Sequence, residues 1–542
     1  MPARLRPPVR PLLLGLALGL LAAGCGRRAT PAELGRRSGT LLVGNGAEPA
    51  DIDPQTSTVY TEENIMIALF EGLTAIDEAT SQPVPAVAES WGSTPDGLVW
   101  TFHLRADARW SNGEPVTADD FVFSYRRVLS PGLASEYSYL LYPIKNAEAF
   151  NAGKLADFSQ VGVKALDPRT LQVTLGAPSP YLPALAAHPC WWPVPRATIE
   201  KFGRFDQRNT AWIKPGNLVG NGPFVLAEWT PNSRIVVRKN PYYWDAARNR
   251  LNAVEFFPIE DIATEERAFR AGQLHVTYSL LPDEIEHYRQ SAPGQVRVDP
   301  FSESYHLRFN TKRAPLDDVR VRRALGMAID RVAIARDVLH GSRTPAYALT
   351  PPNTGGYTPQ ARFPTDFAEA RRLLAEAGYP GGKGFPVLEL QMWTNAINGQ
   401  VAEALQQMWR RELGIDVRLS QLDFRIYLDN RRTFSFQISL SRWIADYDDP
   451  STYLDEFLSY SGNNQTGWAS PAYDRLDQEA SRTLDPARRR ALLQQAEALL
   501  MEQAPIAPIF YGARTYLIAP YVQGWVPSLL GIHRYQFVKL AP

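Results

Sequence analysis

Residues 387–419 read VLELQMWTNAINGQVAEALQQMWRRELGIDVRL. The first seven residues are typical of an extended strand, and apolar side chains then recur at helical spacing through residues 401–409. Gly414 ends the helical pattern, and apolar residues alternate again from Ile415 to Leu419. A strand, a helix and a second strand in this order predict a βαβ unit with parallel strands. We therefore expect a mixed α/β fold.

Other parts of the chain also have readable helix and strand boundaries. Residues 366–377 and 485–503 each begin with an aspartate that is typical of a helix N-cap. A further long helix is expected over residues 317–340. Residues 96–125 contain two turn signals, which predict antiparallel strands followed by a helix that begins at Thr117.

The composition excludes several classes of protein. The chain has 542 residues, of which 45% are hydrophobic and 21% charged, so it can bury several cores and is not a disordered or coiled-coil chain. Lys and Arg number 57, as do Asp and Glu, so no basic excess predicts a nucleic-acid partner. The sequence contains no HExxH, CxxC, GxSxG or P-loop motif. These absences remove the most easily read kinds of catalytic site without excluding catalysis, and we expect no metal, no cofactor and no enzymatic activity.

The N-terminal 24 residues have the three-part layout of a secretory signal peptide. Their apolar run is shorter than the ~20 residues that span a bilayer. Cys25 follows small residues in a pattern that resembles a bacterial lipobox, although Leu21 stands four positions before it and not three. We expect cleavage before Cys25, its lipidation, and a tether over residues 25–39. The alternative is an ordinary signal peptide in which Cys25 has no role.

The second cysteine, Cys190, then has no partner for an internal disulfide. Its neighbours are prolines and tryptophans, which predict a buried, inert thiol.

Four stretches carry longer sequence blocks. They are residues 100–121 (WTFHLRADARWSNGEPVTADDF), residues 221–224 with 238–244 (NGPF and RKNPYYW), residues 310–331, and residues 443–450 (WIADYDDP). In this order they resemble the family 5 extracellular solute-binding proteins, and the last block resembles the oligopeptide-binding branch of that family. The resemblance covers the chain from about residue 40 to its end.

The resemblance implies a two-lobed clamshell of the periplasmic-binding-protein type, type II, with an additional third domain. Residues 40–70, 196–302 and 512–542 would form lobe I, residues 71–195 the additional domain packed on it, and residues 303–511 lobe II. A ligand would lie in the hinged cleft between the lobes.

The function implied is that of an exported, lipid-anchored monomer that captures oligopeptides and passes them to an ABC permease with cytoplasmic ATPases. It would act in the periplasm of a Gram-negative bacterium or on the outer face of a Gram-positive membrane. Backbone pairing with the peptide would provide affinity without reading its side chains. Alternatives are a receptor of the same fold for murein peptides, dipeptides or another small solute, a peptide-sensing or chaperone role, and a secreted hydrolase.

The resemblance also implies a set of site residues. Asp446 occupies the position that meets the peptide α-ammonium, where a hydrogen bond to a charged group contributes roughly 1.5–3 kcal/mol. The alternative is that Asp446 is a turn residue, as we expect for Asp448 and Asp449. The positions that match aromatic residues of the family's cleft are Trp443, Tyr137, Phe424 and Tyr511. Arg431 matches a basic residue near the peptide C-terminus, and Arg308 stands where the family has a carboxylate that lines the pocket.

Several positions depart from the family pattern. Leu339, Asn398 and Leu440 stand where relatives carry C-terminus-binding cations. Glu303 and Ile444 replace a cysteine pair that some relatives have. The nearby cations that could substitute for the missing ones are Arg442, His340, Arg336 and Arg343.

Overall fold

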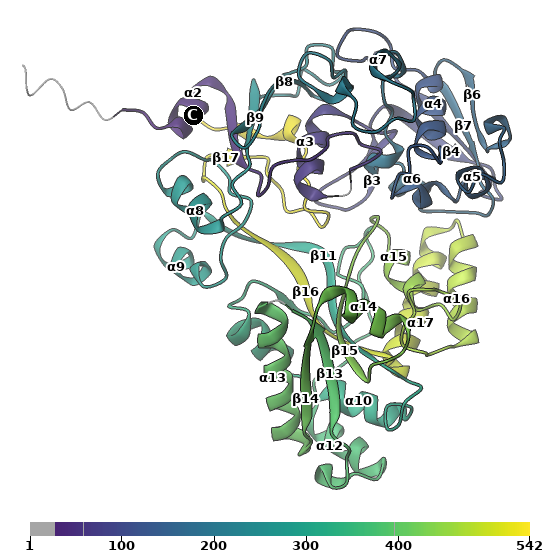
Figure 1. The fold of residues 1–542 in the computed structure, drawn as a ribbon, viewed down its shortest axis with the longest axis vertical. Helices are drawn as coiled ribbons and strands as arrows, with labels where there is room; N and C mark the ends of the chain where they lie inside the picture. Colours follow the sequence, from purple (N-terminus) through teal and green to yellow (C-terminus); the bar gives the residue numbers. More distant parts are fainter. Residues whose placement is uncertain (1–27, 58, 395) are drawn as a thin grey trace, which may run out of the picture.

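The computed structural model describes residues 28–57, 59–394 and 396–542. Two bodies make up the molecule, and two long strands connect them (Figure 1). The upper body contains both the first and the last described segments of the chain, and the lower body contains α10 to α17. None of the helices in the described ranges combines the length and the apolar character needed to cross a membrane.

The upper body is built around a four-stranded sheet in the order β1-β10-β9-β8. Strand β1 pairs in parallel with β10, and the other pairs are antiparallel. Helix α3 packs on this sheet with the C-terminal segment, and a smaller separate core forms around α8 and α9. The elements are α2 (Pro31–Ser38), β1 (Thr40–Gly44), α3 (Tyr60–Leu69), α7 (Arg196–Phe202), β8 (Phe224–Thr230), β9 (Arg234–Lys239), β10 (Ala253–Phe257), α8 (Ile262–Arg270), α9 (Glu284–Ser291), β17 (Val522–Gln523) and β18 (Lys539–Leu540).

An antiparallel sheet in the order β4-β5-β7-β6 forms the core of the additional domain, and its β4–β5 pair turns at Asp96-Gly97, where a turn was predicted. Helix α4 begins after Thr117, whose backbone N–H donates to the Asp120 carboxylate at 2.8 Å. Cys190 is buried in this core, as expected, and burial raises the pKa of its thiol. The elements are β2 (Thr74–Ile76), β3 (Pro83–Pro85), β4 (Ala88–Ser93), β5 (Val99–Leu104), α4 (Ala118–Val128), α5 (Ala147–Asn151), β6 (Val163–Asp167), β7 (Thr170–Thr174) and α6 (Leu182–Leu185).

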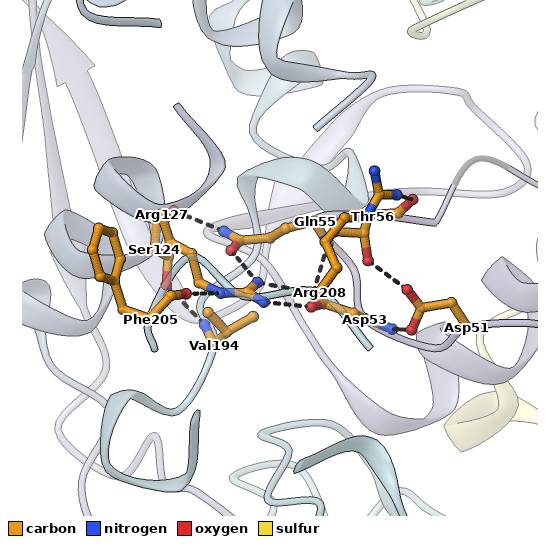
Figure 2. A network of polar contacts seen from close by, with 9 residues as sticks. All are labelled: Asp51, Asp53, Gln55, Thr56, Ser124, Arg127, Val194, Phe205 and Arg208. Carbon is orange, nitrogen blue, oxygen red and sulfur yellow. Dashed lines mark hydrogen bonds and ion pairs between the residues drawn. The ribbon is translucent and has the colours of Figure 1, made fainter. Parts of the chain in front are cut away.

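The upper body contains both lobe I and the additional domain (Figure 1). A buried polar network joins these two parts (Figure 2). The Arg127 guanidinium, on α4, forms an ion pair with Asp53 at 2.6 Å and donates to Gln55 at 2.8 Å. It also donates to the Phe205 carbonyl at 2.6 Å. Arg127 is completely buried, so these contacts compensate a charge that water cannot reach.

The lower body contains a six-stranded sheet in the order β12-β16-β11-β15-β13-β14. Strands β13 and β14 are parallel and α13 connects them, which confirms the βαβ unit. The predicted starts of α12 and α17 are also confirmed, with Asp366 and Asp485 as their N-caps. The elements are β12 (Thr344–Pro345), α12 (Phe367–Glu376), β13 (Leu388–Trp393), α13 (Ala396–Leu413), β14 (Val417–Leu422), α14 (Phe424–Arg432), β15 (Ile438–Ile444), α15 (Ser451–Leu454), α16 (Pro471–Arg482) and α17 (Pro486–Gln503).

The prediction of one long helix over residues 317–340 is wrong. Helix α10 (Val319–Met327) ends first, and a new start follows with α11 (Arg331–Ala333) and a π-helical turn (Ile334–Val338). Asp330 causes the restart, because its carboxylate accepts the backbone N–H of Ala333 at 2.9 Å.

The two connecting strands are β11 (Val296–Phe309) and β16 (Ile506–Leu517), which pair with each other along their length. Their register shifts twice, between Pro300 and Ser304 and between Tyr305 and His306. The lobe boundaries expected at 302/303 and 511/512 fall inside these strands, beside the first shift. The exact domain bounds stay a prediction.

Candidate functional site

A cavity of about 400 Å³ lies between the two bodies. The upper body contributes α3 with the segment after it, and residues 530–536. The additional domain contributes Tyr137 and residues 184–192, and the lower body contributes residues 444–448 after β15. A ligand in this cavity would therefore contact both bodies at once.

Asp446 lies in this cavity at the end of β15. The Thr452 hydroxyl accepts its backbone N–H at 3.1 Å, which fixes the turn. Burial raises the pKa of the Asp446 carboxyl to about 6, and a hydrogen bond from Tyr139 opposes the shift. Among the described residues that line the cavity, the only arginine is Arg534, which lies 3.9 Å from Glu71. Asp446 is thus a half-buried carboxylate that lacks a cation in the described chain.

A second carboxyl group, Glu63 on α3, lines the same cavity. Burial raises its pKa to about 7, although Arg514 opposes the shift. Tyr137 is within electrostatic reach of both acids, and burial with the Asp446 and Glu63 charges raises its pKa to about 12. Burial lowers the pKa of the adjacent His188 to about 4, so this ring is neutral at pH 7. The cavity is therefore suited to a cationic group.

A second cavity, of about 560 Å³, opens in the lower body. Trp443 and Arg431 line it together with Trp393 and Arg442. Arg431 donates to the Tyr427 hydroxyl at 3.2 Å. Because its lining carries guanidinium groups, this cavity is suited to an anion.

The other predicted site residues lie elsewhere. Tyr511 is buried within the large sheet, where its hydroxyl donates to the Ala348 carbonyl at 2.9 Å. Arg308 is fully buried and forms an ion pair with Glu456. Phe424 begins α14, but its side chain lies outside the described structure, and Cys25 lies outside the described residues altogether. Neither Tyr511 nor Arg308 lines the two cavities.

The cations considered as substitutes differ in placement. Arg442 donates to the Glu303 carboxylate at 2.9 Å beside the second cavity. Arg336 is exposed and paired with Asp337, and His340 lies near it, away from both cavities. Arg343 donates to the Ser342 carbonyl.

The positions that depart from the family pattern have structural roles. Leu339 and Leu440 are core residues, and the Asn398 amide donates to the Trp393 carbonyl. Glu303 and Ile444 are direct cross-strand partners, as the positions of a cysteine pair would be.

Sequence reasoning missed Glu63 and Tyr139. Glu62 and Glu63 stand at the start of a helix, where acids are common because they complement the helix dipole. Tyr139 belongs to an aromatic-rich segment without periodicity. The described residues contain no cluster of three or more potential metal ligands.

Comparison with known proteins places these features in a family. The sequence profile described as "Bacterial extracellular solute-binding proteins, family 5 Middle" matches residues 82–465. The periplasmic oligopeptide-binding protein OppA of Salmonella typhimurium is 38% identical over 499 residues, which are 90% of this chain and 89% of that protein.

Two solved structures are also similar. One is the murein tripeptide-binding protein MppA in an unliganded open form, with a TM-score of 0.86 and 35% identity over 93% of this chain and 97% of that one. The other is Haemophilus influenzae OppA in complex with the peptide RPPGFSPFR, with a TM-score of 0.70 and 34% identity over 93% of this chain and 99% of that one.

The unliganded open structure superposes on this protein with the higher TM-score, although the two identities are nearly equal.

Proposed function

The chain belongs to family 5 of the bacterial extracellular solute-binding proteins, and on that premise we propose that it is the oligopeptide receptor of an ABC importer. Its fold is the two-lobed type II clamshell of the periplasmic-binding proteins, with an additional domain. Capture of the peptide would occur in the cleft between the lobes, with no chemistry on the ligand.

The observation that carries this proposal is the opposite charge of the two cavities. Asp446 and Glu63 make one cavity acidic, whereas Arg431 and Arg432 make the other basic, and Arg442 beside them is paired with Glu303. An unblocked peptide is a zwitterion with an ammonium at one end and a carboxylate at the other. An unpaired buried ammonium is very costly, so the Asp446 carboxylate provides the partner that this end requires.

The cellular role follows from the same premise. Residues 1–24 direct export, Cys25 carries the lipid anchor, and the receptor delivers its peptide to a permease driven by cytoplasmic ATPases. Several acyl chains hold a lipoprotein firmly, whereas one chain binds a membrane only marginally. Intact-mass measurement of membrane-extracted protein tests the anchor, because an unmodified or absent Cys25 would contradict it.

Native mass spectrometry of ligands that co-purify with the protein tests the proposed function. We expect a mixture of short peptides, each recovered uncut. Calorimetry then compares a free peptide with its N-acetylated form, and we expect the acetylated form to bind far more weakly. Recovery of a non-peptide solute, or release of cleaved products, would replace peptide capture with another solute or with hydrolysis.

Acidification is expected to weaken peptide binding. The pKa of Asp446 is about 6 in the ligand-free protein, and a bound ammonium lowers it because it stabilises the carboxylate. The free protein therefore binds more protons than the complex, and affinity falls as the pH falls through 6, by roughly tenfold between pH 7 and pH 5. Calorimetry across this range measures the effect. Asp446→Asn should give a shallower profile, and an equally steep one would assign the effect to Glu63.

A further inference from the structure

Helix α2 is the first helix of the described chain, and it packs firmly on lobe I. Figure 1 shows it at the outer edge of the upper body, beside the end of the chain. The backbone N–H of Ala32 donates to the Gly272 carbonyl at 2.9 Å, and the Arg36 guanidinium donates to the Ala541 carbonyl at 2.6 Å. Residues 31–38 lie within the segment expected to be a tether, and these contacts hold them in a fixed position on lobe I.

The other side of α2 faces solvent and combines one apolar side chain with two arginines. Leu34 is 53% exposed, and the exposed Arg37 follows it by about one helical turn. Arg28, just before the helix, is also exposed. An exposed leucine alone is common on soluble proteins, and an arginine in the last turn complements the helix dipole. An apolar side chain flanked by cations is, in addition, typical of a helix that lies on a membrane surface.

Cations outnumber acids around α2. Residues 28–38 contain three arginines and one acid, Glu33. The Glu33 carboxylate accepts the backbone N–H of Thr30 at 2.8 Å, so it serves the helix cap. Two segments that contact α2 add the exposed cations Arg250 and Lys539, whereas the chain end adds one carboxylate. Positive charge therefore predominates at this edge of lobe I, and a negatively charged surface is its complement.

The proposed lipid anchor would keep this edge of lobe I near a membrane. Arg28 stands three residues after Cys25, and three residues of chain span at most about 11 Å. Salt screens charges over about 8–10 Å at physiological ionic strength. An anchored protein therefore carries Arg28 close to electrostatic range of the lipid headgroups even where the connecting chain is fully extended. A small rotation of the protein then brings α2 into contact with them.

We propose that the exposed face of α2, defined by Arg28, Leu34 and Arg37, docks on the anionic lipid headgroups beside the anchor, which rests on the lipid anchor of the proposed function. The two guanidinium groups pair with lipid phosphates, and Leu34 enters the boundary between headgroups and acyl chains. The lipid on Cys25 alone would let the protein swing about its attachment point. The second contact fixes lobe I in one orientation relative to the membrane.

Quenching of a dye on α2 in reconstituted vesicles tests the proposal. The mature lipoprotein carries an environment-sensitive dye on Leu34→Cys, and it is the only labelled position because Cys190 is buried and the Cys25 thiol carries the lipid. The vesicles contain phosphatidylcholine alone or mixed with phosphatidylglycerol. Acrylamide is the quencher, since a neutral molecule reaches both vesicle surfaces equally. We expect the ratio of protected to accessible dye to be roughly tenfold higher on the anionic vesicles. Salt at about 1 M should remove the difference.

Matched variants and a matched dye position are the controls. Arg28→Gln combined with Arg37→Gln should abolish the difference between the vesicles, whereas Arg410→Gln combined with Arg411→Gln, on the exposed surface of α13, should keep it. A dye on Leu166→Cys should stay accessible on both vesicles, because this leucine of β6 is 54% exposed, nearly the same as Leu34.

Three results would overturn the docking face: equal protection on both vesicles, protection that survives the Arg28 and Arg37 substitutions, and equal protection of the dye at Leu166. Peptide affinity is measured on the same variants and should not change, so these results would leave peptide capture intact. If the protein does not float with either kind of vesicle, the anchor at Cys25 is wrong, and the docking face fails with it.

Discussion

We expect Asp446→Asn to lower the affinity for an unblocked peptide by about a hundredfold or more. Removal of one partner from a buried, hydrogen-bonded charge pair costs about 2–5 kcal/mol, much of it because the other charge stays buried and unpaired. The asparagine keeps the size of the side chain and can still accept from Tyr139. Calorimetry with one free peptide and its N-acetylated form measures the loss.

A double-mutant cycle gives this experiment its control. Acetylation and Asp446→Asn remove the two partners of the same contact, so their combined effect should be much smaller than the sum of the separate ones. Asp96→Asn changes an exposed carboxylate of the additional domain and should leave the affinity unchanged. Additive losses would show that Asp446 and the α-ammonium do not meet.

We expect Arg127→Met to lower the free energy of unfolding by about 3–5 kcal/mol. The change leaves the Asp53 carboxylate buried without its cation, and Gln55 and the Phe205 carbonyl lose a donor. Because the network joins the additional domain to lobe I, the two parts should also lose their common unfolding transition. Denaturant unfolding followed by tryptophan fluorescence measures both effects.

Arg169→Met is the matched control, because Arg169 is exposed on the same domain. It should change the free energy of unfolding by less than about 0.5 kcal/mol. If Arg127→Met proves no more destabilising than this control, the network is not what holds the additional domain on lobe I.

Local patterns predicted the fold where one segment determines its own structure. The βαβ unit of β13, α13 and β14 needs only apolar periodicity and Gly414, and the N-caps of α12 and α17 need only one aspartate each. The break between α10 and α11 was missed because residues 319–338 keep helical spacing through it. Only the side-chain hydrogen bond of Asp330 shows where the second helix starts.

The site residues were predicted from the family resemblance and not from local patterns, and only Asp446 and Trp443 of the cavity-lining ones stand inside a quoted sequence block. Asp446 and Tyr137 do line one cavity, and Trp443 and Arg431 do line another. Their contacts with a ligand stay predictions. Glu63 could not be found, because its role depends on a cavity formed by segments far apart in the sequence. The burial of Arg308 against Glu456 is likewise a property of packing that its own neighbours in sequence do not reveal.

Because Cys190 is buried, fluorescent dyes can be attached to the protein at chosen positions. It is the one cysteine in the described part of the chain, and neither a maleimide dye nor a spin label can reach its completely buried sulfur without unfolding. A variant without Cys25 therefore offers a background free of reactive thiols. Cysteines introduced at Lys164, on the additional domain, and Arg411, on α13, would carry a donor and an acceptor dye. Energy transfer between them would report each opening and closing of a single molecule in real time.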